Sequence, residues 1–408
     1  MTDSDGLLGA ARDLGGGVVD MRHELHRWPE LGLHTPRTRE AVLASLEGLP
    51  LDVTLHRTTS GVAALLTGSR PGPTVLLRGD MDALPLHEDT GEACASRNDG
   101  VMHACGHDGH TAMLVGAARL LSGMRDQLAG RVLFMFQPGE ENGAAGARHM
   151  LDEGLLDLPP HAVDGSASAV DAAYAIHLSP NAPTGLVITR PGPLMASSDR
   201  LTITVTGRGG HASQPHGALD PIPVACEIVQ AMQTMVTRRI DVFDPGIVTV
   251  GRIAAGTTTN VIPEVAVVEG TMRAVSAATR QRLHDGVRRV AEGIAAAHGA
   301  TVEVVLGEGY PVTVNDAASA DTVLSVATDL LGARSVYQLP TPTMGAEDFS
   351  FVIERVPGAM VFLGCTPHDR DFTTADSNHS NRVVHDDAAL PTGVALHAAL
   401  ALHHLAVG

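Results

Sequence analysis

The sequence lacks several residues and patterns on which whole classes of function depend. Its 408 residues include no lysine, so all 28 basic residues are arginines, which excludes Schiff-base lysine chemistry and a P-loop lysine. With 46 acidic residues the formal net charge is −18. Nucleic acids and anionic membranes attract basic surfaces, so neither is expected to be a partner of this chain.

Cysteines, aromatic residues and long apolar runs are also scarce. The four cysteines (Cys94, Cys105, Cys226 and Cys365) form no dense disulfide framework. The acidic start, Met1–Asp5, lacks the basic and apolar segments of a secretory signal, and no uninterrupted apolar run reaches about 18 residues. We therefore expect a soluble, cytoplasmic protein. Aromatic residues are 3% of the chain, so aliphatic side chains must build its core.

The order of apolar runs predicts an α/β domain at the two ends of the chain. Short runs bounded by Gly or Pro alternate with amphipathic stretches, which is typical of a largely parallel sheet with helices between its strands. We expect strands at Val62–Leu66, Thr74–Leu77, Val132–Phe136, Ala172–Leu178 and Ala359–Leu363, helices at Val18–Leu31, Thr111–Leu121 and Asp386–Leu405, and a surface loop at Leu158–Asp171.

The middle of the chain has a different order of elements. We expect, in sequence, a strand at Leu201–Val205, a helix at Pro221–Arg239, strands at Gly246–Ile253 and Val265–Val275, a helix at Thr279–His298 and a strand at Val302–Leu306. This β-α-β-β-α-β order is typical of ferredoxin-like domains. The prediction is therefore an α/β domain of residues 1–192 and 307–408, interrupted by an α+β domain of residues 193–306.

The strongest chemical signal is the segment Met102–His110, Met-His-Ala-Cys-Gly-His-Asp-Gly-His. It holds five side chains of the kinds that bind metal, directly before an expected helix. In an extended segment Cys105 and His107 would point the same way, and thiolate and imidazole are good ligands for zinc-like ions. The alternative is a His-rich surface loop with a free cysteine.

Three further signals lie at the ends of expected strands. Gln137-Pro138-Gly139-Glu140-Glu141 follows one strand, Arg78-Gly79-Asp80-Met81-Asp82 follows another, and His177 ends a third. Ligand sites in open α/β sheets lie beyond the carboxyl ends of the strands. Of two adjacent carboxylates, one can bind metal while the other accepts a proton from water. Alone, the glutamates could be a solvated turn and His177 an ordinary histidine; their convergence carries the argument.

The middle domain offers weaker candidates. His211 follows the Gly-rich turn Gly207–Gly210, from which a histidine could donate to a developing oxyanion. Asn260 and Arg273 lie on the same expected domain, and arginine suits a carboxylate because its planar group binds both oxygens. Each could equally be an exposed surface group. Motifs of competing enzyme classes, such as Gly-x-Ser-x-Gly and His-Glu-x-x-His, are absent from the sequence.

Four of these segments together carry a family resemblance. Arg78–Pro85, Val101–Thr111, Gln137–Glu141 and Gly345-Ala346-Glu347-Asp348-Phe349 resemble the amidohydrolase branch of the aminoacylase/carboxypeptidase metallopeptidase superfamily. That branch includes hippurate hydrolases, N-acyl-L-amino acid amidohydrolases and indole-acetyl-amino-acid hydrolases. The likeness runs from about His26 to the C-terminal helix. It implies an α/β metal domain interrupted by a ferredoxin-like lid that also forms a homodimer.

The resemblance implies a role for each candidate residue. Two divalent ions, zinc or manganese with cobalt or nickel as alternatives, would be held by Cys105, His107, Glu141, His177 and His379. Glu140 would be the general base and His211 would stabilise the oxyanion, reaching across to the active site of the partner subunit. Asn260 and Arg273 would hold the substrate carboxylate. The substrate would be a small N-acyl amino acid, hydrolysed to a carboxylic acid and a free amino acid.

Two other functions stay open at this stage. A dipeptidase or carboxypeptidase would use the same metals and differ only in the groups that bind the acyl end of the substrate. A non-catalytic protein that retained the fold and a metal site is the alternative from another class, although Glu140 is present. The sequence does not indicate the acyl group, the preferred amino acid or the native metal.

Overall fold

The computed structural model describes residues 4–160 and 169–407, which form two compact units. Unit 1 comprises residues 1–194, 314–341 and 348–408, and unit 2 comprises residues 195–313 and 342–347. The domain limits expected from the sequence, with 193–306 as the inserted domain, stay a prediction. Part of the expected surface loop at Leu158–Asp171, residues 161–168, lies outside the described residues.

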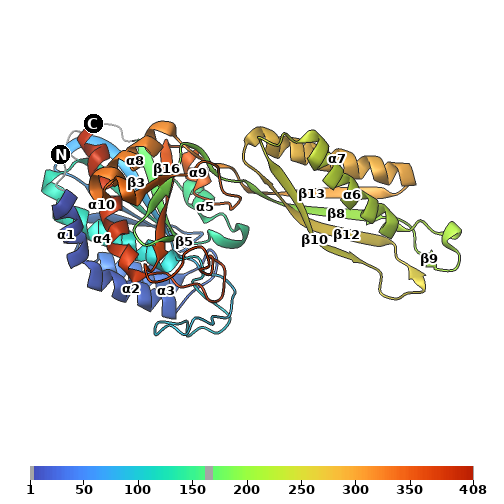
Figure 1. The fold of residues 1–408 in the computed structure, drawn as a ribbon, viewed down its shortest axis with the longest axis horizontal. Coiled ribbons are helices and arrows are strands. Elements are labelled where there is room, and N and C mark those ends of the chain that lie inside the picture. The colour runs from blue at the N-terminus through green and yellow to red at the C-terminus, as the bar shows by residue number, and fades with distance from the viewer. Residues whose placement is uncertain (1–3, 161–168, 408) are drawn as a thin grey trace. The chain divides into compact units, whose positions relative to one another are not determined.

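Unit 1 contains an eight-stranded sheet whose centre is parallel, as expected (Figure 1). Its order is β1 (Leu51–Leu55), β2 (Val62–Thr67), β4 (Ala129–Gln137), β3 (Arg70–Asp80), β5 (Ala172–Pro183), β16 (Gly358–Thr366), β6 (Val187–Thr189) and β15 (Val336–Gln338). The pairs β4–β3, β3–β5 and β5–β16 are parallel. Asp80 is paired with Gln137 in this register, so the segments after β3 and β4 leave the sheet at the same edge.

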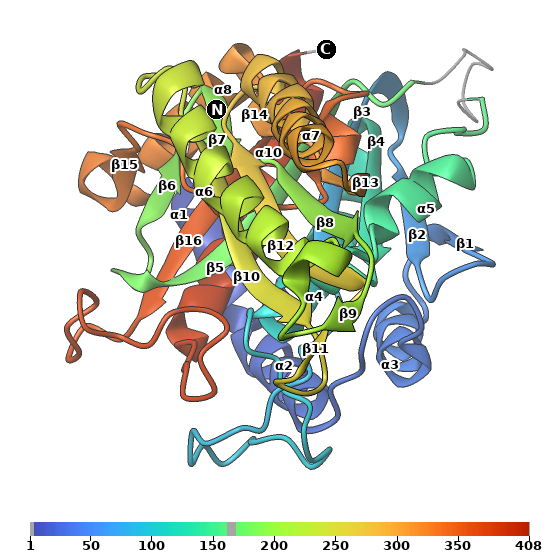
Figure 2. The same cartoon turned by 90° about the vertical axis from the view of Figure 1, so that its right-hand side faces the viewer.

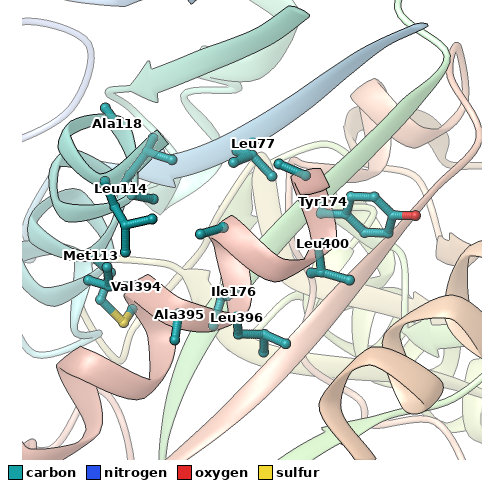
Figure 3. Packing of buried hydrophobic residues seen from close by; sticks show 14 of the residues in the cluster. Leu77, Met113, Leu114, Ala118, Tyr174, Ile176, Val394, Ala395, Leu396 and Leu400 are labelled. Carbon is teal, nitrogen blue, oxygen red and sulfur yellow. The ribbon is translucent and has the colours of Figure 1, made fainter. Parts of the chain in front are cut away.

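Helices α4 and α10 form the core of unit 1 with the central strands. The helices of this unit are α1 (Ser4–Asp13), α2 (Gly15–Arg27), α3 (Pro36–Leu46), α4 (His107–Gly123), α5 (Gly146–Asp152), α8 (Ala317–Leu331), α9 (Ser350–Ile353) and α10 (Leu390–Val407). Figure 3 shows Met113 and Leu114 of α4, and Val394 and Leu396 of α10, beside Ile176 of β5. These side chains are buried, and burying one aliphatic side chain contributes about 1.5–3 kcal/mol.

One segment, Asp387–Leu405, is long and apolar enough to cross a membrane, which the search for uninterrupted apolar runs did not detect. It includes nearly all of α10, and 67% of its apolar window is buried within the protein. Helix α10 packs against α1, α4 and α8. Its apolar surface is therefore covered by unit 1 itself, as in the core helix of a soluble protein.

Unit 2 has the expected ferredoxin-like topology. Its elements are β8 (Ser198–Thr206), α6 (Pro221–Arg239), β10 (Gly246–Ala255), β12 (Val265–Ala274), α7 (Ala277–His298) and β13 (Thr301–Tyr310). The antiparallel sheet has the order β10-β12-β8-β13, and α6 packs against α7 (Figure 2). Short strands β9 (Gly210–His211) and β11 (Val261–Ile262) pair beside it, while β7 (Gly192–Met195) and β14 (Thr313–Asn315) pair where the chain passes between the units.

Local sequence explains where the two helices of unit 2 begin and end. Asp220 accepts a hydrogen bond from the Ile222 N–H, and Pro221 occupies the first helical position, where its missing N–H costs nothing. Ser276 caps α7 in the same way through the Thr279 N–H. Helix α7 ends at Gly299, whose left-handed backbone (φ 74°) suits glycine. These signals are why the predicted bounds of both helices lie within two residues of the observed ones.

Candidate metal centre

A left-handed glycine brings Cys105 and His107 to the same place. Gly106 has φ 84°, and α4 begins at His107. The expectation that Cys105 and His107 point the same way because they lie in an extended segment was therefore wrong about the backbone, which turns between them. A Cβ atom on Gly106 would lie 3.2 Å from His385 Nε2 and from Leu178 Cβ, so glycine is required for space as well as for its backbone angle.

The other predicted ligands join this pair from three separate segments. Cys105 Sγ lies 3.5 Å from Nε2 of His177, which is on β5; that strand continues beyond the expected end at Leu178 to Pro183. His379 Nε2 lies 3.1 Å from Glu141 Oε1. The ligand atoms of Cys105, His107 and His177 lie within 4.8 Å of one another, as do those of Cys105, Glu141 and His379, and those of His107, Glu140 and Glu141. Unit 1 therefore gathers Glu140 and all five predicted ligands in one cluster.

Hydrogen bonds to backbone carbonyls fix the tautomers of two of these histidines. Nδ1–H of His107 donates to the carbonyl of Asp82 at 2.8 Å, and Nδ1–H of His177 donates to the carbonyl of Leu178 at 2.8 Å. In its neutral form each ring then has its lone pair on Nε2, the nitrogen that faces the cluster. Both imidazoles are oriented as metal ligands by atoms outside the cluster.

The electrostatics of the cluster favour a cation. Burial, together with neighbouring His110, holds the pKa of His177 well below its ordinary value, so this ring is neutral. Hydrogen bonds to Cys105 and Glu141 raise the pKa of His379 to about 10. The thiol and carboxylate thus stabilise a positive charge at the position where they meet His379.

The donor set fits a divalent ion. Thiolate, imidazole and carboxylate are together the ligands of zinc and related metals. Among the described residues, the buried Nε2 of His107 makes no hydrogen bond, although Asp80 Oδ2 lies 3.3 Å away. A buried nitrogen that lacks a hydrogen bond beside a thiol and two carboxylates is well suited to ligate a metal.

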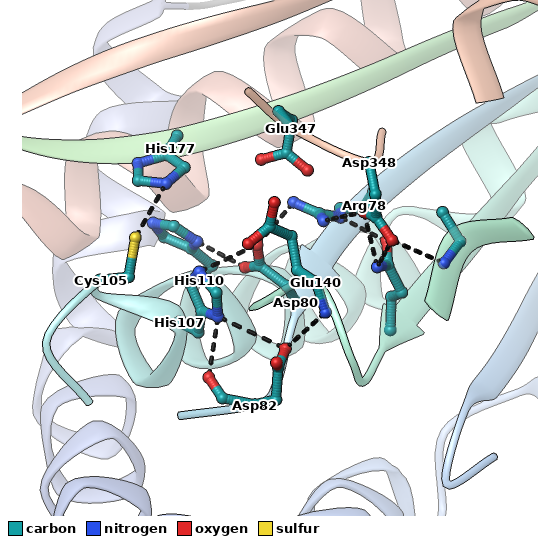
Figure 4. A network of polar contacts seen from close by, with 12 residues as sticks. Arg78, Asp80, Asp82, Cys105, His107, His110, Glu140, His177, Glu347 and Asp348 are labelled. Carbon is teal, nitrogen blue, oxygen red and sulfur yellow. Dashed lines mark hydrogen bonds and ion pairs between the residues drawn. The ribbon is translucent and has the colours of Figure 1, made fainter. Parts of the chain in front are cut away.

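Asp82 organises the segment that carries the two glutamates. Its carboxylate accepts hydrogen bonds from the backbone N–H groups of Glu140 (2.9 Å) and Glu141 (3.0 Å). Both glutamate side chains are buried, at 6% and 7% exposure. Holding the backbone at this turn places Glu140 beside His107 without using the carboxylate of Glu140 itself (Figure 4).

A second buried carboxylate, Asp80, belongs to a polar network behind the cluster (Figure 4). Arg78 donates to Asp80 Oδ2 at 2.7 Å and to Asp348 Oδ1 at 3.1 Å, while Nδ1–H of His110 donates to Asp80 Oδ1 at 2.6 Å. Burial would raise the pKa of Asp80, but Arg78, His107 and His110 hold it well below its usual range. Sequence reasoning left Asp80 and His110 without a role, although both lie inside the motifs it singled out.

The three remaining candidates lie on unit 2. His211 is in β9, where its Nδ1 accepts hydrogen bonds from the Ser213 N–H (3.1 Å) and hydroxyl (2.7 Å), so the neutral ring has its proton on Nε2. The Ala212 N–H donates to the carbonyl of Asn260, which brings these two segments together. Arg273 on β12 is half-buried, and its side chain makes no hydrogen bond or ion pair within the described residues. Burial lowers its pKa.

Comparison with known proteins places these features in context. Residues 76–403 match the family model of peptidase family M20/M25/M40. The chain is 36% identical to thermostable carboxypeptidase 1 of Saccharolobus solfataricus over 97% of both chains, and 39% identical to an N-acetylcysteine deacetylase of Bacillus subtilis over 85% of this chain and 88% of the relative. A dinuclear metal-binding peptidase of the M20 family from Bacillus subtilis has the same fold, with a TM-score of 0.80, 34% identity and coverage of 97% and 99%.

Proposed function

The chain belongs to peptidase family M20/M25/M40, and from this membership we propose that it hydrolyses the amide bond of small N-acyl amino acids. The products are a carboxylic acid and a free amino acid. The observation that carries the proposal is the cluster in which buried Glu140 lies with five side chains of ligand type, all of them buried except His379. A relative named as a deacetylase of an N-acetyl amino acid, 39% identical to this chain, supports the choice of substrate class.

Cys105, His107, Glu141, His177 and His379 hold two divalent ions in this proposal, with zinc or manganese expected and cobalt or nickel as alternatives. Bound divalent ions lower the pKa of water towards about 7 and polarise the carbonyl of the substrate. The side chains supply everything else. Replacing Cys105 by Ala tests the ligand set directly, since the variant should bind less metal by elemental analysis. Wild-type metal content would exclude Cys105 as a ligand.

Glu140 is the general base. Its carboxylate takes a proton from the attacking water and then gives that proton to the nitrogen of the leaving amino acid. The backbone of Glu140 is fixed by Asp82 at 2.9 Å, so the carboxylate returns to the same position for both transfers. A carboxylate with only 6% exposure is also protected from exchanging its proton with bulk water.

Unit 2 carries the remaining residues of the proposal. His211, which has its proton on Nε2, donates a hydrogen bond to the developing oxyanion, and Asn260 and Arg273 bind the substrate carboxylate. In a homodimer, His211 would serve the active site of the partner subunit. The anionic substrate needs Arg273 because the chain as a whole has a net charge of −18. A cytoplasmic location, with neither nucleic acid nor membrane as partner, completes the proposal.

The test is amino-acid release from a panel of N-acyl amino acids and dipeptides. Metal-stripped protein and protein reconstituted with Mn²⁺ or Zn²⁺ are assayed side by side. We expect metal-dependent cleavage of one N-acyl class, which also identifies the acyl group. If bound metal is demonstrated and nothing in the panel is cleaved, the proposal is wrong and a non-catalytic role becomes the better hypothesis.

A carboxypeptidase or dipeptidase activity is the second candidate, because a relative named as a carboxypeptidase matches 97% of this chain. The same panel separates the two functions. A kcat/KM for dipeptides or longer peptides well above that for N-acyl amino acids would favour peptide hydrolysis. The reverse order would favour the amidohydrolase.

A further inference from the structure

One peptide group, that of Leu178, binds the side chain of its neighbour His177 and two side chains that are distant in the sequence, His110 and Asn378. Its N–H donates to Nε2 of His110 at 2.7 Å. Its carbonyl oxygen accepts from Nδ1–H of His177 at 2.8 Å and from the amide Nδ2–H of Asn378 at 3.1 Å. Because His110 accepts at Nε2, its proton is on Nδ1, where it donates to Asp80. The Leu178 peptide is thus held on both sides.

The amide of Asn378 has a defined orientation. Its oxygen Oδ1 lies 2.9 Å from Nε2 of the buried His385, whose N–H donates to it. The amide nitrogen must then face the carbonyl of Leu178 rather than the reverse. Asn378 therefore bridges His385 and Leu178 of β5, which is 200 residues away in the sequence.

Asn378 directly precedes His379, whose ring meets Glu141 Oε1 at 3.1 Å. The side chain of His379 is 55% exposed, and its backbone is in the left-handed region (φ 72°), a conformation that favours glycine. Its backbone N–H donates to the carbonyl of Ala104 at 2.8 Å. Apart from the contacts of its ring, His379 is thus held by its own backbone bond beside Cys105 and, through Asn378, by the bond to Leu178 beside His177.

From this geometry we propose that Asn378 is a positioning residue, which sets His379 relative to His177 by donating its amide hydrogen to the Leu178 carbonyl. Without that bond, the loop that carries His379 is held less firmly against β5, and the ion bound through His379 loses affinity. The inference rests on the proposed ligation by His177 and His379, and it is independent of the substrate.

The decisive variant is Asn378→Asp. Aspartate has the shape of asparagine and still accepts from His385, but it places a second oxygen against the Leu178 carbonyl where a donor was. Losing a hydrogen-bond partner that orients a metal ligand typically lowers metal affinity about 10–100-fold. Asn378→Ala removes the bond without adding charge. Asn381→Asp is the matched control, because it makes the same change in the same loop and the Asn381 side chain forms no hydrogen bond within the described residues.

The experiment measures metal affinity rather than turnover. Full-length wild type, the three variants and His379→Ala are stripped with a chelator and titrated with Zn²⁺ by calorimetry. Co²⁺-substituted samples give visible absorption spectra that report ligand geometry. Fluorescence of Trp28, the single tryptophan, verifies that unit 1 is folded. We expect Asn378→Asp and Asn378→Ala to bind one ion about 10–100-fold more weakly with an altered Co²⁺ spectrum, and Asn381→Asp to match wild type.

Three contrary results are distinguishable. If His379→Ala binds metal weakly while both Asn378 variants keep wild-type affinity and spectrum, the ligation stands and the positioning role of Asn378 is wrong. If His379→Ala itself binds both ions as wild type does, His379 is not a ligand, and the inference fails together with that part of the proposed site. Equal weakening by Asn381→Asp would also overturn the inference, because the effect would then be one of charge.

Discussion

The carboxylate of Asp82 accepts a hydrogen bond from the backbone N–H of Glu140 at 2.9 Å, which joins two turns that follow neighbouring strands. The other carboxylate oxygen accepts the Glu141 N–H, and the carbonyl of Asp82 accepts Nδ1–H of His107. One residue thereby orients a proposed base and two proposed ligands. It does so while it is 1% exposed, so water cannot replace these bonds.

Replacing Asp82 by Asn should weaken metal binding, although the two side chains have nearly the same shape. The amide accepts one of the two glutamate N–H groups but turns its own NH₂ towards the other, which leaves a buried donor unpaired at a cost of about 1–3 kcal/mol. We expect metal affinity to fall about 10–100-fold by calorimetric titration. Asp89→Asn, on an exposed neighbouring loop, is the control. Unchanged affinity in Asp82→Asn would show that the glutamate turn holds its position without this carboxylate.

Glu140→Gln separates binding from chemistry. Glutamine keeps the size of the side chain and leaves the backbone bond to Asp82 intact, but it cannot take a proton from water. We expect metal content to stay at the wild-type level while kcat falls about 10²–10⁴-fold, which is the usual contribution of a general base. Elemental analysis and a steady-state assay on the best substrate measure both quantities. A variant with wild-type kcat would show that another group carries the proton.

The convergence of the proposed ligands could be predicted from the sequence, but its geometry could not. Strand ends, apolar runs and polar residues after them placed Glu140, Glu141 and His177 at one edge of the sheet, as observed. The left-handed turn at Gly106 escaped prediction, because an isolated Gly between Cys105 and His107 is equally compatible with an extended segment. His379 was predicted as a ligand from the family resemblance alone, because no predicted strand or helix directly precedes it in the sequence.

Residues that act through long-range contacts left the weakest signals. Asn378 is a polar residue in a polar loop, and nothing nearby indicates that its amide reaches Leu178. Asp80 and Asp348 both lie within motifs and are joined through the buried Arg78. Asp348, however, is 270 positions from Arg78 in the sequence. Local sequence patterns predict which side of a helix or strand a side chain lies on. They do not predict which distant backbone atom that side chain contacts.

Buried His397 should make the protein sensitive to acid. On α10 it is fully buried, and neither ring nitrogen has a hydrogen-bond partner within the described residues. Burial, with a smaller effect of His110, lowers its pKa from 6.5 to about 3. Between pH 6.5 and 3 the unfolded chain therefore binds one more proton than the folded chain. The free energy of unfolding is thus unaffected by protonation of His397 above pH 6.5 and decreases as the pH falls below it.

The variant His397→Leu should lack this decrease in the free energy of unfolding, because leucine does not bind a proton. From pH 7 to pH 5, we expect wild type to lose about 2 kcal/mol more free energy of unfolding than the variant does. Urea unfolding followed by Trp28 fluorescence measures it, since that residue lies in unit 1 with His397. His403→Leu, at an exposed position of the same helix, should behave as wild type. Parallel pH profiles for wild type and His397→Leu would mean that the pKa of His397 is the same in the folded and unfolded protein.

Arg273 should discriminate between substrates that differ only in their carboxylate. Its half-buried side chain has no hydrogen bond or ion pair within the described residues, although the charge of Asp199 acts on it, so its donors are available to an anion. A charge-assisted pair contributes about 1.5–3 kcal/mol, so Arg273→Ala should raise KM for an N-acyl amino acid about 10–100-fold. For the same substrate with its carboxylate converted to a neutral amide, KM should change little in the variant, because wild type already binds this amide without the ion pair. Arg252→Ala, which breaks an exposed ion pair with Glu269 on the adjacent strand, is the control and should leave both KM values unchanged. If Arg273→Ala weakens acid and amide substrates equally, the arginine maintains the shape of unit 2, and another group must recognise the carboxylate.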